Sequence, residues 1–233
     1  MDDSTATTWQ PLDGVSVTAD ARAVVVRSVR PLQVLSSAIG GGGFTSARSV
    51  VNLHVDDAYG GDRPEEDVAA CAADLGLAGP VVGLLTATAT EHAQVAVEAH
   101  AGLVVAAVVS VGLSNTTAAG LSPPAGHVAP GTINTVLLVD AALTPAAMVN
   151  AVITATEAKT MMLVAWDVRT PQGTPASGTS TDSVVVACTG RGDELRYAGP
   201  ATTVGWLAAR AVRAAVDRIC REKLARDGGR VGW

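Results

Sequence analysis

The stretch Thr144–Trp166, TPAAMVNAVITATEAKTMMLVAW, predicts the element around which the rest of the chain folds. Thr144 is a good N-cap residue, and Pro145 suits the first helical position, where its missing N–H costs no hydrogen bond. The residues after Pro145 are apolar on nearly every face, so we expect a helix buried inside the protein. Its only formal charges are Glu157 and Lys159, and a charge buried without a partner costs several kcal/mol. The two charges therefore indicate where chemistry takes place.

The composition predicts a well-buried globular protein. Of the 233 residues, 48% are hydrophobic and only 16% are charged. Aromatic residues make up 3%, so Val, Ala and Leu must form the core. The formal net charge of −6 gives no basic surface, which argues against nucleic acid as a partner. Cys71, Cys188 and Cys220 lack CxxC spacing and are interpreted as buried thiols, not as disulfides or zinc ligands.

Two stretches bear on localisation. The run Ala101–Leu113 is apolar and uncharged, but it is much shorter than the roughly 20 residues of a membrane-spanning helix. We therefore expect it to be a buried strand, with no membrane insertion. The start, MDDSTATTWQ, is acidic where a signal peptide is basic and then apolar, so we expect a cytoplasmic protein.

The order of apolar runs and turn signals predicts one α/β domain with a mixed β-sheet, in which an N-terminal β meander precedes interspersed helices and strands. Strands are predicted at 15–19, 23–27, 32–39, 49–55, 81–86, 103–111, 132–139 and 183–188. Helices are predicted at 64–73, 91–101, 144–166 and 203–225, and loops at 115–130, 170–181 and 191–197. Residues 1–233 form a single domain in this prediction, with 1–10 and 227–233 flexible.

Five segments resemble one known family. In order, they are SAIGGG (Ser37–Gly42), RSVVNLHV with its following Tyr (Arg48–Tyr59), GTIN (Gly131–Asn134), TEAKT (Thr156–Thr160) and GTSTD (Gly178–Asp182). Together they resemble the adenosylcobinamide amidohydrolases, the CbiZ-type enzymes of corrinoid salvage, from about Ser36 to Gly205. One departure is the stretch 110–116, SVGLSNT, where a Thr-Ala-Gly…Asn-Ala pattern is expected, although Asn115 stays in place.

The resemblance implies hydrolysis of the amide that joins the corrin propionyl side chain to aminopropanol. The products would be adenosylcobyric acid and 1-amino-2-propanol, in vitamin B12 salvage. The alternative is a non-catalytic corrinoid-binding or carrier protein. Such a carrier could dispense with Glu157 and Lys159, which this chain has.

Glu157, Lys159 and Asp182 are the candidate catalytic residues. Glu157 and Lys159 lie two positions apart and so project about 200° apart on a helix. In one mechanism, Glu157 is the general base on water, Lys159 polarises the carbonyl, and Asp182 orients Lys159 or a threonine hydroxyl. In the rival mechanism, Thr179 or Thr181 is a nucleophile that Lys159 activates. A purely structural ion pair of Lys159 with Asp182 or Asp140 is the alternative to both.

The candidate substrate-binding residues are small or polar. Backbone N–H groups of Gly41, Gly42 and Gly43 are available for an oxyanion, unless the cluster is only a turn. Asn side chains pair with the carboxamides of a corrinoid as donor and acceptor, unless they cap strand ends. The remaining candidates are Asn52, Asn115, Asn134, Thr179 and Thr181, of which the two threonines also fit a local turn.

Metal and cofactor sites have little support in the sequence. His92, His100 and His127 show no metal-binding spacing, and only His54 lies close enough to a candidate residue to be retained. We therefore expect no metal and no required cofactor, since the cobalt belongs to the substrate. The expected partner is a small-molecule corrinoid, and a homo-oligomer is possible.

Overall fold

A computed structural model describes residues 6–124 and 131–226. Their main feature is a nine-stranded mixed sheet with the order β1-β2-β3-β12-β9-β7-β6, to which β4 adds beside β3 and β5 beside β4. The strands are β1 (Thr7–Leu12), β2 (Val15–Ala19), β3 (Ala23–Ser36), β4 (Gly43–His54), β5 (Val81–Thr86), β6 (Gln94–His100), β7 (Leu103–Val111), β9 (Ile133–Val139) and β12 (Ser183–Cys188). The predicted α/β class, mixed sheet and N-terminal meander are confirmed.

The long strand β3 joins two halves of this sheet. Its first part pairs with β2 and its last part, Gln33–Ser36, pairs with β12, while β4 runs along the other side. The β3–β4 register shifts between Arg27 and Leu32, at an irregularity that lets the strand bend. The runs at 23–27 and 32–39 that we predicted as separate strands therefore belong largely to one strand. The first half carries β1 to β5, and the second carries β6, β7, β9 and β12.

The two halves face each other across a shared apolar layer. Val17, Val26 and Val50 from the first half pack with Val108 and Val136 from the second. Alternate residues of β7 and β9 point to the opposite side, where they form a second core with the helices. Strands covered on both faces read as continuous apolar runs, as residues 103–111 and 133–139 do.

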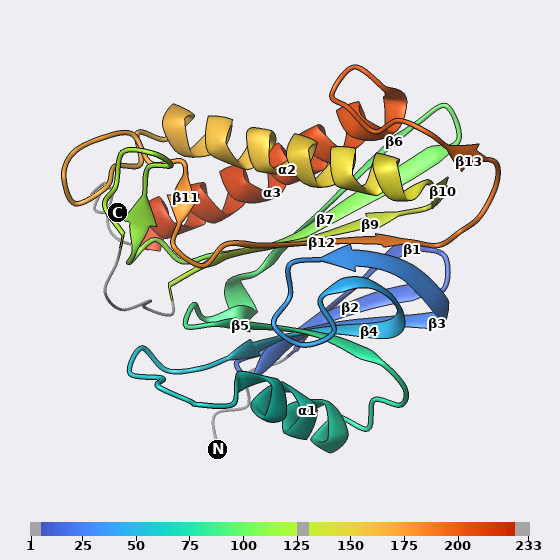
Figure 1. Cartoon of the computed structure of the whole chain (residues 1–233), viewed down its shortest axis with the longest axis horizontal. Coiled ribbons are helices and arrows are strands. Elements are labelled where there is room, and N and C mark those ends of the chain that lie inside the picture. Colours follow the sequence, from blue (N-terminus) through green and yellow to red (C-terminus); the bar gives the residue numbers. More distant parts are fainter. Residues whose placement is uncertain (1–5, 125–130, 227–233) are drawn as a thin grey trace.

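In the described part of the chain, three α-helices cover the outer faces (Figure 1). The helices α2 (Pro145–Ala165) and α3 (Thr203–Arg226) lie side by side over the second half, and α1 (Pro64–Asp74) lies on the opposite side against the first half. Thr144 caps α2, since its hydroxyl accepts a 3.2 Å hydrogen bond from the N–H of Ala147. Cys71, Cys188 and Cys220 are buried free thiols, as predicted.

The predicted helix at 91–101 is wrong. The chain forms a short 3-10 helix, η1 (Thr90–His92), and then the edge strand β6, which pairs antiparallel with β7. Ala101 and Gly102 connect the two strands with positive φ angles of 50° and 79°, as in a tight hairpin turn. The pairing with β7 overrides the helical preference of the Ala-rich segment.

Two short ribbons and the first strand also differ from the predictions. The predicted loops contain β8 (Thr116–Thr117), which pairs with β11 (Gly178–Thr179), and β13 (Glu194–Leu195). β13 pairs with β10 (Ala142–Leu143), which lies just before α2. Residues 7–10, predicted as flexible, belong to β1, which pairs with β2. The rest of the predicted flexible termini, 1–5 and 227–233, and loop residues 125–130 lie outside the described residues.

The predicted full burial of the 144–166 helix is also wrong. One face of α2 packs on the core, but the opposite face is open, and Val149, Ile153, Met161 and Val164 are 46–62% exposed. The helix lies in the outermost layer, so solvent reaches the side that faces away from the sheet. Glu157 lies on this exposed side, whereas Lys159 is buried.

Three polar side chains connect the two halves of the sheet. Asn134 on β9 donates hydrogen bonds of 2.8 Å to the side-chain oxygen of Asn52 on β4 and to the carbonyl of Leu85 on β5. Asn52 in turn donates a 2.9 Å bond to the hydroxyl of Ser110 on β7. All three side chains are buried, so their polar groups depend on one another.

We predict that Asn134→Ala lowers the free energy of unfolding by about 1–3 kcal/mol, because it leaves the buried Asn52 oxygen and the part-buried Leu85 carbonyl without their donor. Asn52→Ala should act similarly, and the double variant should lose less than the sum of the two. Urea unfolding measures all three, with Asn150→Ala on α2 as a control that stays within about 0.5 kcal/mol. Strictly additive losses would contradict the coupling.

Candidate functional site

The candidate site lies where the parallel strands β9 and β12 begin. Residues 178–182 (GTSTD) form the short strand β11 and the turn that enters β12. One carboxylate oxygen of Asp182, Oδ1, accepts three hydrogen bonds: 3.1 Å from the N–H of Thr179, 2.5 Å from the Thr179 hydroxyl and 3.1 Å from the N–H of Ile133. The turn predicted for this segment is therefore present, and it fixes the Asp182 carboxylate against the start of β9.

The other carboxylate oxygen of Asp182 forms an ion pair with the ammonium group of Lys159. The two side chains are only 16% and 9% exposed. Such a buried pair is costly to desolvate, and removing one partner costs about 3–5 kcal/mol because the other charge is left alone. Lys159 thus has the partner that a buried lysine on an apolar helix requires, and that partner is Asp182 rather than Asp140.

Gly178 leaves the space in which this ion pair sits. A Cβ atom added there would overlap both the Oδ2 atom of Asp182 and the ammonium nitrogen of Lys159. Any residue with a side chain would therefore displace one of the two charges. The glycine of the GTSTD segment is required by packing, whether or not the segment takes part in catalysis.

Two further threonines attach the turn to the start of β9. Thr132 donates a 2.8 Å hydrogen bond to the carbonyl of Thr181, and the Thr181 hydroxyl donates one of 2.8 Å to the carbonyl of Gly131. The N–H of Thr181 lies 3.4 Å from the Thr179 hydroxyl oxygen and donates to it. Thr179 is buried, and its hydroxyl lies between Asp182 and Thr181.

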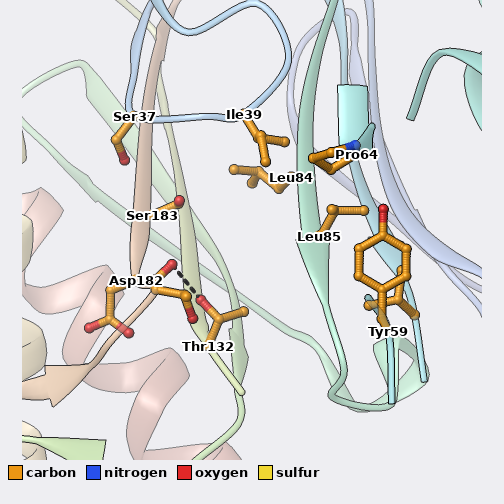
Figure 2. A pocket seen from close by; sticks show the side chains of 11 residues that line it. Ser37, Ile39, Tyr59, Pro64, Leu84, Leu85, Thr132, Asp182 and Ser183 are labelled. Atoms are coloured by element: carbon orange, nitrogen blue, oxygen red, sulfur yellow. Dashed lines mark hydrogen bonds between the residues drawn. The ribbon is translucent and has the colours of Figure 1, made fainter. Parts of the chain in front are cut away.

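A pocket of about 440 Å³ opens beside this cluster. Figure 2 shows its two unlike walls: Ser37, Thr132, Asp182 and Ser183 on one side, and Ile39, Tyr59, Pro64, Leu84 and Leu85 on the other. Most of the polar wall comes from the second half of the sheet, with Ser37 from just after the end of β3. The apolar wall comes from β5, the glycine turn between β3 and β4, the loop after β4 and the start of α1. The pocket therefore places an apolar surface opposite the Asp182 carboxylate. The Thr179 hydroxyl donates to this carboxylate, but Thr179 is buried and is not among the described residues that line the pocket.

Tyr59 is fixed at the apolar wall by a hydrogen bond. Its hydroxyl donates to a carboxylate oxygen of Asp67 on α1 at 2.5 Å. Burial, and then this bond to Asp67, raises the pKa of Tyr59 to about 12. The phenol therefore stays protonated at neutral pH, and its ring is held in place at the pocket.

Glu157 does not take the place that the first mechanism requires. Its side chain is exposed on the outer face of α2, so the expected burial of this carboxylate is absent. It is also not among the residues that line the pocket in the described part of the chain. Nothing in the structure supports Glu157 as the base, and the carboxylate that lies at the pocket is Asp182.

The predicted glycine loop is explained largely by packing. Gly40 pairs with Gly83 of β5 through two backbone hydrogen bonds. Side chains at Gly41 and Gly42 would collide with the carbonyls of Val81 and Ala38. These contacts favour the interpretation as a tight turn, and contact of Gly41, Gly42 or Gly43 with an oxyanion stays a prediction.

The predicted asparagines and His54 lie in different places. The amides of Asn52 and Asn134 are engaged in the bridge between the sheet halves, so we assign them to that bridge rather than to substrate. Asn115 lies at the turn of the candidate site and donates a 2.8 Å hydrogen bond to the Ser180 hydroxyl. The Nδ1 atom of His54 lies 3.1 Å from the carbonyl oxygen of Ala21.

Several pocket residues were not predicted. Ser37, Ile39, Tyr59 and Thr132 lie within the family-like segments, so that signal was available. Leu84 and Leu85 lie in an ordinary apolar strand, and no local pattern distinguishes them from core residues. In the described ranges, no helix is long and apolar enough to cross a membrane.

We predict that Gly178→Ala destabilises the protein by about 1–3 kcal/mol, as overpacking does, because the added methyl group must displace Lys159 or Asp182. Thermal unfolding monitored by circular dichroism measures the loss. Gly199→Ala is the matched control, because a Cβ at that position meets no atom within 4 Å. Equal melting temperatures for the two variants would show that the space at Gly178 is not needed.

Sequence comparisons with known proteins identify one family. The family model described as adenosylcobinamide amidohydrolase matches residues 9–227. An adenosylcobinamide amidohydrolase of Halobacterium salinarum is 38% identical over 185 residues, which cover 75% of this chain and 74% of that protein. One of Methanosarcina mazei is 31% identical over 173 residues, 70% of this chain and 78% of that protein. Among solved structures, a β-aminopeptidase of Burkholderia sp. aligns with a TM-score of 0.45 and 14% identity over 86% of this chain and 79% of its own.

Proposed function

We propose that this chain, which belongs to the adenosylcobinamide amidohydrolase family, hydrolyses the amide between the corrin propionyl side chain and aminopropanol. The products would be adenosylcobyric acid and 1-amino-2-propanol. The family resemblance inferred from the five segments is confirmed, and the chain is accordingly a hydrolase. The substrate bond, the products and the residues that act on them are our proposal.

The observation that carries the proposal is the row Thr179–Asp182–Lys159, of which Asp182 lines the pocket while Thr179 and Lys159 contact its carboxylate. A nucleophile needs a base within hydrogen-bonding distance, and the base needs a third group that orients it. The Thr179 hydroxyl donates to Asp182 at 2.5 Å, and Lys159 holds the other oxygen of the same carboxylate. This geometry supports the threonine mechanism, with Asp182 instead of Lys159 in direct contact with the hydroxyl.

In the proposed first step, the Thr179 oxygen attacks the amide carbon while its proton passes to Asp182. The carbon–nitrogen bond then breaks as that proton moves to the nitrogen of the leaving aminopropanol. An ester between the corrin propionyl group and Thr179 remains. Water attacks this ester, Asp182 takes a proton from the water, and the Thr179 hydroxyl is restored as the carboxylate product leaves.

Lys159 has an electrostatic role in this scheme. Its ammonium group keeps the Asp182 carboxylate oriented toward Thr179, and it offsets the negative charge in a site shielded from water. Thr132 and Thr181 hold the turn in register with β9. A rival scheme has the same carboxylate activating water directly, with Thr179 only orienting it.

Incubating the purified protein with adenosylcobinamide tests the activity itself. Chromatography should detect adenosylcobyric acid, and amine analysis should detect 1-amino-2-propanol in equal amount. Corrinoid that binds without either product would indicate the carrier alternative.

We predict that Thr179→Ala lowers kcat at least about a hundredfold, because the variant lacks the hydroxyl whose proton passes to Asp182. About a hundredfold is the lower end of what general acid–base catalysis contributes. Thr179→Ser should retain part of the activity, and Glu157→Gln, on the exposed face of α2, should keep nearly all of it. The measurement is the steady-state rate of aminopropanol release. Corrinoid binding by Thr179→Ala, followed by its absorbance, shows that the pocket is intact.

Each variant can contradict one scheme. Full activity of the Thr179→Ala variant would exclude Thr179 as the nucleophile and would favour the scheme in which Asp182 activates water. An inactive Glu157→Gln variant would restore Glu157 as the base.

A further inference from the structure

The pocket beside Asp182 is too small for the whole proposed substrate. Its volume of about 440 Å³ lies toward the lower end of the roughly 300–1,000 Å³ that holds a drug-sized ligand. A corrinoid has a macrocycle with a fringe of methyl and carboxamide groups, and it is larger than such a ligand. If the scissile amide arm occupies this pocket, the ring must lie outside it, against another surface.

A second hollow of about 420 Å³ begins next to the first. It lies between the glycine turn and α1, and Ile39 lines both hollows. Ile39 is 44% exposed, so it forms a ridge between them rather than part of the core. The two hollows are therefore neighbours that share one apolar side chain.

The second hollow is lined mostly by small and apolar side chains. One face of α1 contributes positions 65, 68, 69, 72 and 73, which are spaced as a single helical stripe. Three of these are alanines, and the opposite side is formed by Gly40, Gly41 and Val81. Glu65 is the single charged residue among the described residues that line it. Small side chains and bare backbone leave room for a broad group.

We infer that this second hollow holds the methyl-bearing edge of the corrin macrocycle while the aminopropanol arm lies in the first pocket. The inference rests on the proposed function, and it goes beyond it by assigning a ring-binding site. Ile39 then contacts the substrate where the arm leaves the ring. The carboxamides of the ring would point outward to solvent, because Glu65 is the one lining side chain among the described residues that can hydrogen-bond to them.

Two alanines on the same helix provide a matched test. Ala69 lines the hollow, whereas Ala70, equally on the exposed surface of α1, does not. Ala69→Trp should fill the hollow and weaken the binding of adenosylcobinamide at least about tenfold, or about 1.4 kcal/mol. Ala70→Trp should leave the dissociation constant unchanged. Equilibrium dialysis, followed by the visible absorbance of the corrin, measures both substitutions in the Thr179→Ala variant, in which the hydrolysis of adenosylcobinamide is suppressed. Ala73→Trp repeats the test from a second lining position.

The same assay with aquocobinamide, which lacks the adenosyl group, identifies the part of the substrate that is bound. If Ala69→Trp weakens the binding of both corrinoids equally, the result supports the ring as the occupant of the second hollow. If it weakens the binding of adenosylcobinamide alone, the occupant is the adenosyl group and the inference is overturned. Equal affinities of Ala69→Trp and Ala70→Trp would overturn the site altogether. Wild-type protein that binds corrinoid but releases no aminopropanol would refute the proposed activity and leave this binding test intact.

Discussion

The buried ion pair between Lys159 and Asp182 sets the conditions that the rest of the candidate site must meet. Either charge alone would be strongly destabilising in so shielded a place, so both must arrive together with their remaining hydrogen bonds satisfied. Backbone N–H groups satisfy the carboxylate, and Gly178 leaves the necessary space. The helix that carries the lysine is attached to the same turn, because the Thr160 hydroxyl donates to the carbonyl of Ser177. The rotation of α2 about its axis, the turn and the start of β9 therefore form one interdependent unit.

The bend of β3 has a comparable importance for the pocket. Because this strand pairs first with β2 and then with β12, it turns one sheet into two facing halves. The polar wall of the pocket belongs to one half and most of the apolar wall to the other (Figure 2). The bridge of Asn52, Ser110 and Asn134 holds these halves together near the same end of the strands. The site therefore depends on the closure of the sheet as much as on the turn that carries Asp182.

Much of the architecture could be predicted because local patterns report burial directly. Continuous apolar runs identified the strands around 103–111, 133–139 and 183–188, and Thr144-Pro145 identified the start of α2. The prediction failed at 91–101, where pairing with β7 decides the structure. It also failed at Glu157, because this residue lies on the face of α2 that is exposed to solvent. An almost uniformly apolar helix carries no periodic signal that shows which side faces the core.

The sequence by itself determined the family, the α/β class and the residue types available for chemistry, because these depend on ordered motifs and on the period of apolar residues. Only the tertiary structure decided which charges meet. It paired Lys159 with Asp182, directed Glu157 to solvent, and turned Asn52 and Asn134 toward each other. The physical reason is that a side chain's role depends on neighbours that are distant in sequence, and those neighbours are fixed only when the sheet closes and α2 docks on it.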